Sequence, residues 1–118
     1  MTIKLNERAY RHAKRLVEEG EWIHDEREAW SDHHQSTQTE EEFIERNGFF
    51  EYGKWFLGVN DEYSKDRRRH YELPYGDFDK VHRCSILAAQ SRARQSEALD
   101  VENAAADLLA VIDEQARD

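Results

Sequence analysis

Six histidines are the first residues of this chain that could do chemistry, because imidazole titrates near neutral pH and binds transition metals. His33 and His34 are adjacent and directly follow Asp32 in a polar stretch. A metal site needs three or four ligands that converge in space. Asp32, His33 and His34 are therefore the candidate metal ligands, and the alternative is that they are ordinary surface side chains. None of the spacings typical of strong metal motifs occurs, so we predict no cofactor.

Nucleophilic chemistry has little support in the sequence. Cys84 is the only cysteine, and it falls on the apolar stripe of an expected helix, where a free cysteine is usually a small core residue. Ser85 and Ser91 do not lie in a Gly-x-Ser-x-Gly or Ser-x-x-Lys motif. The many carboxylates are explained by helix caps and turns. We therefore predict no catalytic residue, and a non-enzymatic protein is the favoured interpretation.

One short basic segment interrupts an otherwise acidic sequence between Tyr63 and Tyr71. Aromatic side chains beside arginines can stack on bases while the arginines neutralise phosphates. The candidate nucleic-acid residues are Lys65, Arg67, Arg68 and Arg69. The alternative, which we favour, is a solvated loop whose arginines pair with the protein's own carboxylates. The formal net charge of −9 supports it, since a negative protein repels phosphate backbones.

The spacing of hydrophobic residues predicts the helices and strands that must position these side chains. The pattern predicts an N-terminal helix over residues 6–19, capped by Asn6, with Arg8, Arg11 and Arg15 on its polar side. A loop pinned by Trp22 and Trp30 should follow. Thr39 should then begin a short capped helix that stops at residues 47–48.

The second half of the chain predicts a small two-stranded ribbon and two helices. Residues 55–59 and 71–75 read as extended segments. Asp77 or Asp79 should cap a helix that runs to about residue 95, and Asp100 should cap the last helix. The 79–95 helix is apolar on two sides, and Ile86 lies on the second side, which could face the last helix or another subunit. Together these elements predict a mainly helical α+β fold.

Composition sets the broad class. The 118 residues suit one domain, residues 1–118, with only 38 % hydrophobic and 36 % charged residues. So few aliphatic side chains make a homodimer our expectation. The single cysteine and the absence of an apolar leader or a 20-residue apolar run predict a cytoplasmic protein that does not enter membranes.

Five segments carry a likeness to known proteins: residues 55–58, 71–78, 81–84, 88–93 and 102–105. Through these segments the sequence resembles a group of short, uncharacterised bacterial proteins over most of the chain. The second half is also similar, more distantly, to a small module of phage and prophage proteins. Neither resemblance implies an activity.

Taken together, these features predict a non-enzymatic, homodimeric interaction module. The candidate interaction residues are Ile86, Trp22, Trp30 and Tyr75, since tryptophan and tyrosine concentrate binding energy at interfaces. The alternative is a small metal-binding protein or enzyme that uses the histidine and carboxylate cluster.

Overall fold

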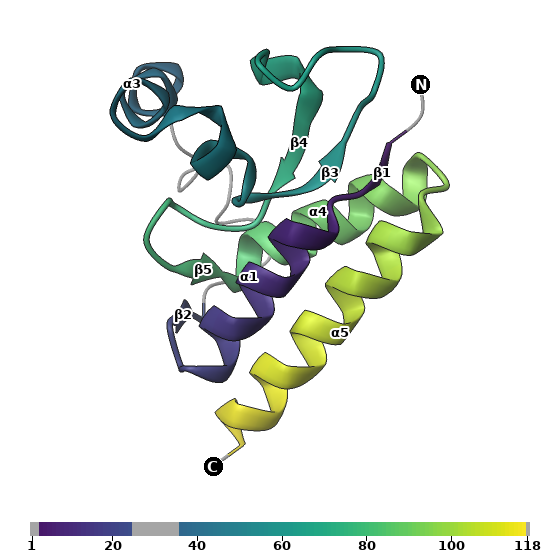
Figure 1. Cartoon of the computed structure of the whole chain (residues 1–118). Coiled ribbons are helices and arrows are strands. Elements are labelled where there is room, and N and C mark those ends of the chain that lie inside the picture. The colour runs from purple at the N-terminus through teal and green to yellow at the C-terminus, as the bar shows by residue number, and fades with distance from the viewer. Residues whose placement is uncertain (1–2, 25–35, 118) are drawn as a thin grey trace.

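Four helices and five short strands make up residues 3–24 and 36–117, which are the residues described by this computed structural model. In chain order they are β1 (Lys4–Leu5), α1 (Glu7–Glu18), β2 (Trp22–Ile23), α3 (Thr37–Gly53), β3 (Phe56–Val59), a 3-10 turn (Arg68–His70), β4 (Tyr71–Pro74), β5 (Val81–His82), α4 (Arg83–Gln95) and α5 (Leu99–Ala116). Figure 1 shows α3 and α5 at opposite sides of the molecule, with the strands and α4 between them. The mainly helical α+β fold is the one that the sequence predicted.

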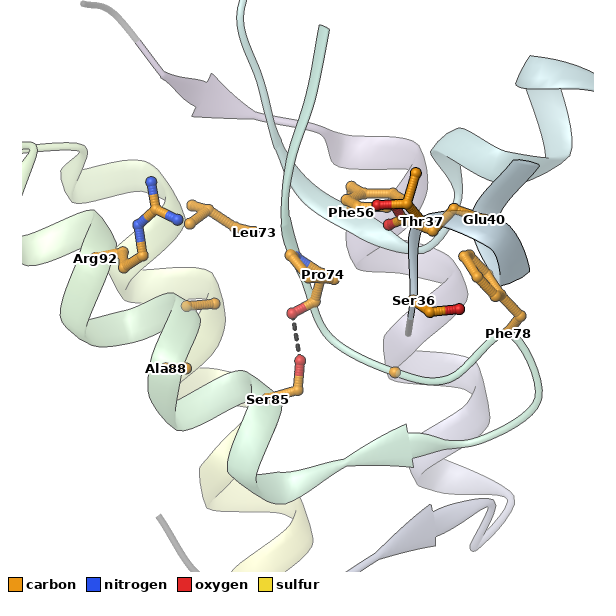
Figure 2. Close-up of a pocket in the computed structure, with 12 residues that line it drawn as sticks. Ser36, Thr37, Glu40, Phe56, Leu73, Pro74, Phe78, Ser85, Ala88 and Arg92 are labelled. Atoms are coloured by element: carbon orange, nitrogen blue, oxygen red, sulfur yellow. Dashed lines mark hydrogen bonds between the residues drawn. The ribbon is translucent and has the colours of Figure 1, made fainter. Parts of the chain in front are cut away.

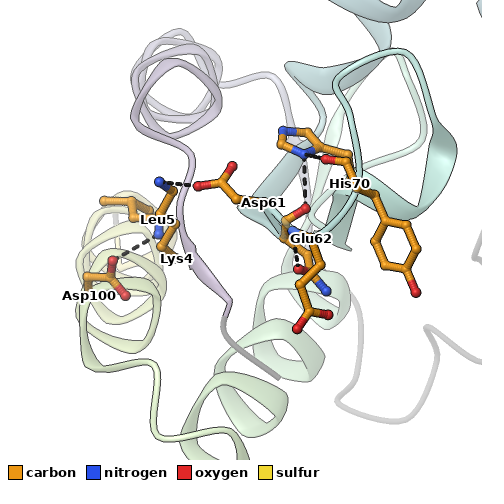
Figure 3. Close-up of polar contacts among 8 residues, drawn as sticks. Lys4, Leu5, Asp61, Glu62, His70 and Asp100 are labelled. Atoms are coloured by element: carbon orange, nitrogen blue, oxygen red, sulfur yellow. Dashed lines mark hydrogen bonds and ion pairs between the residues drawn. The ribbon is translucent and has the colours of Figure 1, made fainter.

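The predicted ribbon is present as β3 and β4, and a third strand extends it. The antiparallel order is β1-β3-β4, with Lys4 opposite Val59 and Phe56 opposite Pro74. Strand β1 was not predicted, because two residues are too few to show the alternating pattern of a strand. Its position depends on distant groups: Leu5 donates its backbone N–H to Asp100 at 2.8 Å, and Lys4 forms an ion pair with Asp61 (Figure 3).

A second, parallel pair joins β2 to β5, with Trp22 opposite Val81 and Ile23 opposite His82. The sequence predicted a loop at this point, pinned by Trp22 and Trp30. That prediction is wrong for residues 22–23, because the pairing partner lies nearly sixty residues along the chain and leaves no local signal. Trp30 lies outside the described residues.

Helix α1 agrees closely with its prediction. Asn6 caps it by accepting a hydrogen bond from the Ala9 amide, and the side-chain amide of Asn6 donates to the carbonyl oxygens of Gly53 and Phe56 at 2.9 and 3.1 Å. One side chain therefore ties the helix start to both α3 and β3. The side of α1 away from the arginines is the buried one, where Ala9, Ala13 and Val17 are fully buried.

Helix α3 begins earlier and extends further than predicted. Its cap is Ser36, whose hydroxyl accepts from the Thr39 amide at 3.1 Å, so the predicted cap at Thr39 is wrong. The predicted break is present, because Gly48 has a φ of 84° that interrupts the helix. The chain then resumes a helical path to Gly53, which was not predicted. The aromatic residues Phe49, Phe50 and Tyr52 show no helical period of their own, and tertiary packing decides their conformation.

The C-terminal helix pair is confirmed, but its starts differ from the prediction. Helix α4 begins at Arg83 after the strand residue His82, so neither Asp77 nor Asp79 caps it. Helix α5 follows Ala98, and Asp100 lies inside its first turn.

The core lies where α1, α4 and α5 meet the inner face of the three-stranded sheet (Figure 1). Both apolar sides of α4 are used within the single chain: Ile86 and Ala93 are fully buried, as are Leu108 and Ile112 of α5. Each large aliphatic side chain buried in this way contributes about 1.5–3 kcal/mol. Helix α4 is therefore enclosed by its own chain.

Candidate functional site

The predicted metal ligands Asp32, His33 and His34 lie outside the described residues. Within residues 3–24 and 36–117, no group of three or more histidine, cysteine or acidic side chains is arranged to hold a metal ion. Cys84 is fully buried, which agrees with the core position that its spacing predicted. The metal proposal therefore gains no support from the described part of the chain.

Two of the four predicted interaction residues are inaccessible to a partner. Ile86 and Tyr75 are both fully buried within the single chain. Of the two alternatives for the second apolar side of α4, the last helix is therefore the one observed, because α5 and the sheet cover Ile86. Trp22 is half-buried and donates its indole N–H to Gln115 at 2.6 Å, which fastens β2 to the end of α5. Trp30 is outside the described residues.

The basic segment is a structured connection between β3 and β4. His70 holds it closed, since its Nδ1 lies 3.0 Å from the carbonyl oxygen of Asn60 and 2.8 Å from that of Tyr63 (Figure 3). Arg68 forms an ion pair with Glu40 at 2.5 Å, as the intramolecular alternative predicted. The Tyr71 ring packs into the aromatic core, which removes one of the two expected stacking surfaces.

The best-formed concave site is a cavity of about 390 Å³ between α3, β4 and α4, here called the α3–α4 pocket. Its size falls within the range of small-molecule sites. Figure 2 shows its walls converging from these separate parts of the chain. The lining residues are Ser36, Thr37, Glu40, Phe56, Leu73, Pro74, Gly76, Phe78, Ser85, Ala88, Ala89 and Arg92.

Two of the lining residues have an unusual backbone. Leu73 has a φ of 64° and Phe78 a φ of 69°, and both are side-chain-bearing residues in the left-handed region. Such conformations cost about 1–3 kcal/mol each and persist only where the surroundings fix them. Of the three non-glycine residues with positive φ in the described chain, two therefore line the same pocket.

The Phe78 wall is fixed by a tight turn and by aromatic packing. Asp77 Oδ1 accepts hydrogen bonds from the amides of Asp79 and Lys80 at 3.0 and 2.7 Å. The Phe78 ring stacks on Phe43 of α3, with centroids 4.4 Å apart and planes 14° apart. The turn and α3 thus hold one face of the pocket in place.

Five of the twelve residues that line the pocket are polar, and three of these are already engaged. Ser85 donates its hydroxyl to the Pro74 carbonyl oxygen (Figure 2), Ser36 accepts from the Thr39 amide, and Glu40 is held by Arg68. The exposed Arg92 side chain has no ion pair within the described residues. The described lining therefore combines apolar walls with one guanidinium that no described carboxylate neutralises.

Known proteins give no guide to the function of this chain. No protein-family model, curated protein or solved structure matches the chain. Among the described residues, no helix is long and apolar enough to cross a membrane.

Sequence reasoning missed the pocket because its residues come from distant segments. Ser85 was interpreted only as a small residue that lets helices approach, whereas its hydroxyl fastens α4 to β4. Arg92 gave a possible signal, as a cation beside a run of alanines on α4. That signal cannot be distinguished from an ordinary exposed arginine until β4 and α3 are in place.

Proposed function

We propose that this chain is a non-enzymatic binding module whose α3–α4 pocket takes a small organic carboxylate with an apolar body. The observation that carries this proposal is the combination of the apolar walls of this cavity with the Arg92 guanidinium, which has no ion pair among the described residues. Guanidinium groups bind carboxylates through two parallel hydrogen bonds. The apolar part of the ligand would lie against Phe56, Leu73 and Phe78.

The polar side chains that line the pocket favour binding over catalysis. The described lining holds neither histidine nor cysteine, and its carboxylate, Glu40, is neutralised by Arg68. The Ser85 hydroxyl already donates its proton to Pro74, and the described lining offers it no general base. These groups orient and hold a ligand, which suits recognition.

A compact ligand fits better than an added peptide strand. Strand β4 is an edge of its sheet, and an edge strand can pair with an extended peptide. At this edge, however, the Pro74 nitrogen has no hydrogen to donate, and the Pro74 carbonyl accepts from Ser85. The pairing groups at the pocket are therefore missing or already used.

Isothermal titration calorimetry with phenylacetate tests the assignment, with phenylacetamide as the neutral analogue. Arg92→Gln should weaken phenylacetate about tenfold, the effect of losing one charge-assisted hydrogen bond, and should leave phenylacetamide unchanged. Arg94→Gln is the matched control, because Arg94 lies on the same helix and already pairs with Glu102 at 2.6 Å. Ala88→Phe should abolish binding of both probes by filling the cavity.

Two results would contradict the proposal. If neither phenylacetate nor octanoate binds the wild-type protein at millimolar concentration, the pocket does not recognise apolar carboxylates. If Arg92→Gln and Arg94→Gln weaken phenylacetate equally, the effect reflects net charge and not a site at the pocket rim.

The homodimer remains a separate proposal, since the pocket is complete in one chain. With Ile86 buried, a self-association surface needs other apolar residues. Phe50 and Leu99 are 69 % and 66 % exposed, and they are the large hydrophobic side chains most available for it.

A further inference from the structure

A second hollow, of about 450 Å³, opens on the outer face of α1, and it is basic although the chain as a whole is acidic. We call it the α1 hollow. Its lining residues are Arg8, Arg11, His12, Arg15, Phe50, Glu51 and Lys54. Four cationic side chains thus face a single carboxylate.

The spacing of these cations along α1 makes them repel one another. Arg8, Arg11 and Arg15 are three and four residues apart, so they lie on one face of α1, where like charges repel. Arg15 reaches Glu19 only at 3.9 Å, and Arg11 has no ion pair within the described residues. An anion bound between them would remove this repulsion.

Two of the cations are held in position before any ligand arrives. The Arg8 guanidinium lies 3.2 Å from the centre of the Phe50 ring and donates a hydrogen bond to the Phe50 carbonyl oxygen at 2.7 Å. Lys54 forms an ion pair with Glu51 at 2.7 Å. Fixed donors lose less entropy when they bind a ligand.

The hydrogen bonds of His12 define which of its nitrogens is left for a ligand. Tyr75 donates its hydroxyl proton to the Lys54 carbonyl oxygen at 2.6 Å, because a carbonyl can only accept. His12 Nδ1 lies 2.6 Å from the same hydroxyl oxygen, so Nδ1 must carry the proton and donate it. The other nitrogen, Nε2, therefore has a free lone pair in neutral His12.

The surroundings of His12 favour its neutral form. Burial lowers its pKa most, and the charges of Lys54 and Arg15 lower it further, while the Lys54 backbone carbonyl and the charge of Glu51 act in the opposite direction. Arg8 and Arg11 line the same hollow and add positive charge. A bound anion would offset these charges and favour protonation of Nε2.

We propose that the α1 hollow binds the phosphate group of a small phosphomonoester, held by Arg8, Arg11, Arg15 and Lys54. The protonated Nε2 of His12 donates a further hydrogen bond to a phosphate oxygen. Binding is consequently coupled to proton uptake. A compact ligand is favoured over nucleic acid, because the hollow is one local site and a long polyanion would meet the net charge of −9.

Nuclear magnetic resonance of the full chain tests this proposal, with inorganic phosphate and glycerol 3-phosphate as probes at ionic strength held constant with chloride. We expect saturable shifts of the α1 amides and a rise in the His12 pKa. Arg11→Gln combined with Arg15→Gln should weaken binding by roughly tenfold or more, as expected for lost charge-assisted contacts. The matched control, Arg46→Gln with Arg67→Gln, removes two exposed arginines elsewhere and should leave binding unchanged.

The outcomes separate the alternatives. Shifts that do not saturate, or equal loss in both double variants, would overturn the site. Tighter binding of a short single-stranded oligonucleotide, lost in the Arg11 and Arg15 variant, would reassign the hollow to nucleic acid. His12→Gln should retain phosphate binding but lose the part of its pH dependence that exceeds the phosphate's own second ionisation at about pH 6, and a pH dependence equal to that of the wild type would overturn the role of His12. Arg92→Gln should have no effect, so this result is independent of the carboxylate pocket.

Discussion

Replacing Asp77 should loosen the α3–α4 pocket without altering any group that lines it. The Asp77 carboxylate accepts three hydrogen bonds: from the amides of Asp79 and Lys80 at 3.0 and 2.7 Å, and from His82 Nε2 at 2.8 Å. These bonds close the turn that carries Phe78 and lead the chain into β5. The carboxylate therefore connects the backbone of the turn to the residue that precedes α4.

The cost follows from these contacts. Hydrogen bonds to charged groups contribute about 1.5–3 kcal/mol each when buried, and the side chain of Asp77 is 25 % exposed, so water replaces part of each one. Asp77→Ala should lower the free energy of unfolding by about 2–4 kcal/mol. Asp77→Asn keeps one acceptor for the turn amides and should cost about 1–2 kcal/mol. Both variants should also weaken phenylacetate binding, since Phe78 loses its fixed position.

The pH dependence of stability separates the contribution of the negative charge on Asp77 from that of its shape. Burial acts to raise the pKa of Asp77, but the Lys80 amide and His82 outweigh it, so the pKa in the folded state is below the ordinary 3.8. A lowered pKa means that ionised Asp77 stabilises the fold above its unfolded pKa and that this contribution is lost as the pH falls through the folded value. The stability gap between wild type and Asp77→Asn should therefore be largest at neutral pH and close below about pH 4.

Urea denaturation at pH 7 and at successively lower pH measures this gap. Asp79→Asn is the matched control, because Asp79 belongs to the same turn and is exposed. A gap that stays constant between pH 7 and pH 3, or an equal loss in Asp79→Asn, would refute the reasoning.

Four further outcomes follow. Gly76→Ala should destabilise the protein by about 2 kcal/mol or more, since the added Cβ would lie 2.4 Å from the Lys80 carbonyl oxygen. Gly20→Ala, which meets no atom within 4 Å but has a φ of 79°, should cost only about 1 kcal/mol, and thermal denaturation compares the two. Asn6→Ala should cost about 2–4 kcal/mol in urea denaturation, because it removes a helix cap and two partly buried hydrogen bonds. Sedimentation equilibrium should give twice 14.0 kDa if the proposed homodimer forms, and Leu99→Glu should then shift it to monomer; a wild-type monomer at high concentration would end that proposal.

The parts of the fold that the sequence predicted are those in which local spacing and burial agree. In α1, the buried residues recur every four positions on the side away from the predicted polar side, so spacing alone located this helix and its orientation. The break at Gly48 was also predictable, because glycine adopts a positive φ without the steric cost that other residues meet. Such features depend on a few neighbouring residues only.

The errors arose where partners are distant. Asp77 is a residue type that often caps helices, but its carboxylate accepts hydrogen bonds from its own turn and from His82. Helix α4 starts six residues later. For Ile86 the sequence left two alternatives open, the last helix or another subunit, because spacing within α4 does not show how completely α5 and the sheet enclose it. The α3–α4 pocket requires α3, β4 and α4 together, so no single segment could indicate it.

One tryptophan supports both proposed sites, and this determines which variants can separate them. The Trp55 ring contacts His12 edge-on at 5.0 Å and Phe78 edge-on at 6.1 Å, and it stacks on Tyr75 at 5.4 Å. Removing Trp55 would therefore disturb the His12 hydrogen bond and the Phe78 wall at the same time. A change in either binding activity after such a substitution would report the shared aromatic core. The arginine variants act from the solvent side of each site, so they leave Trp55 packed and test each site by itself.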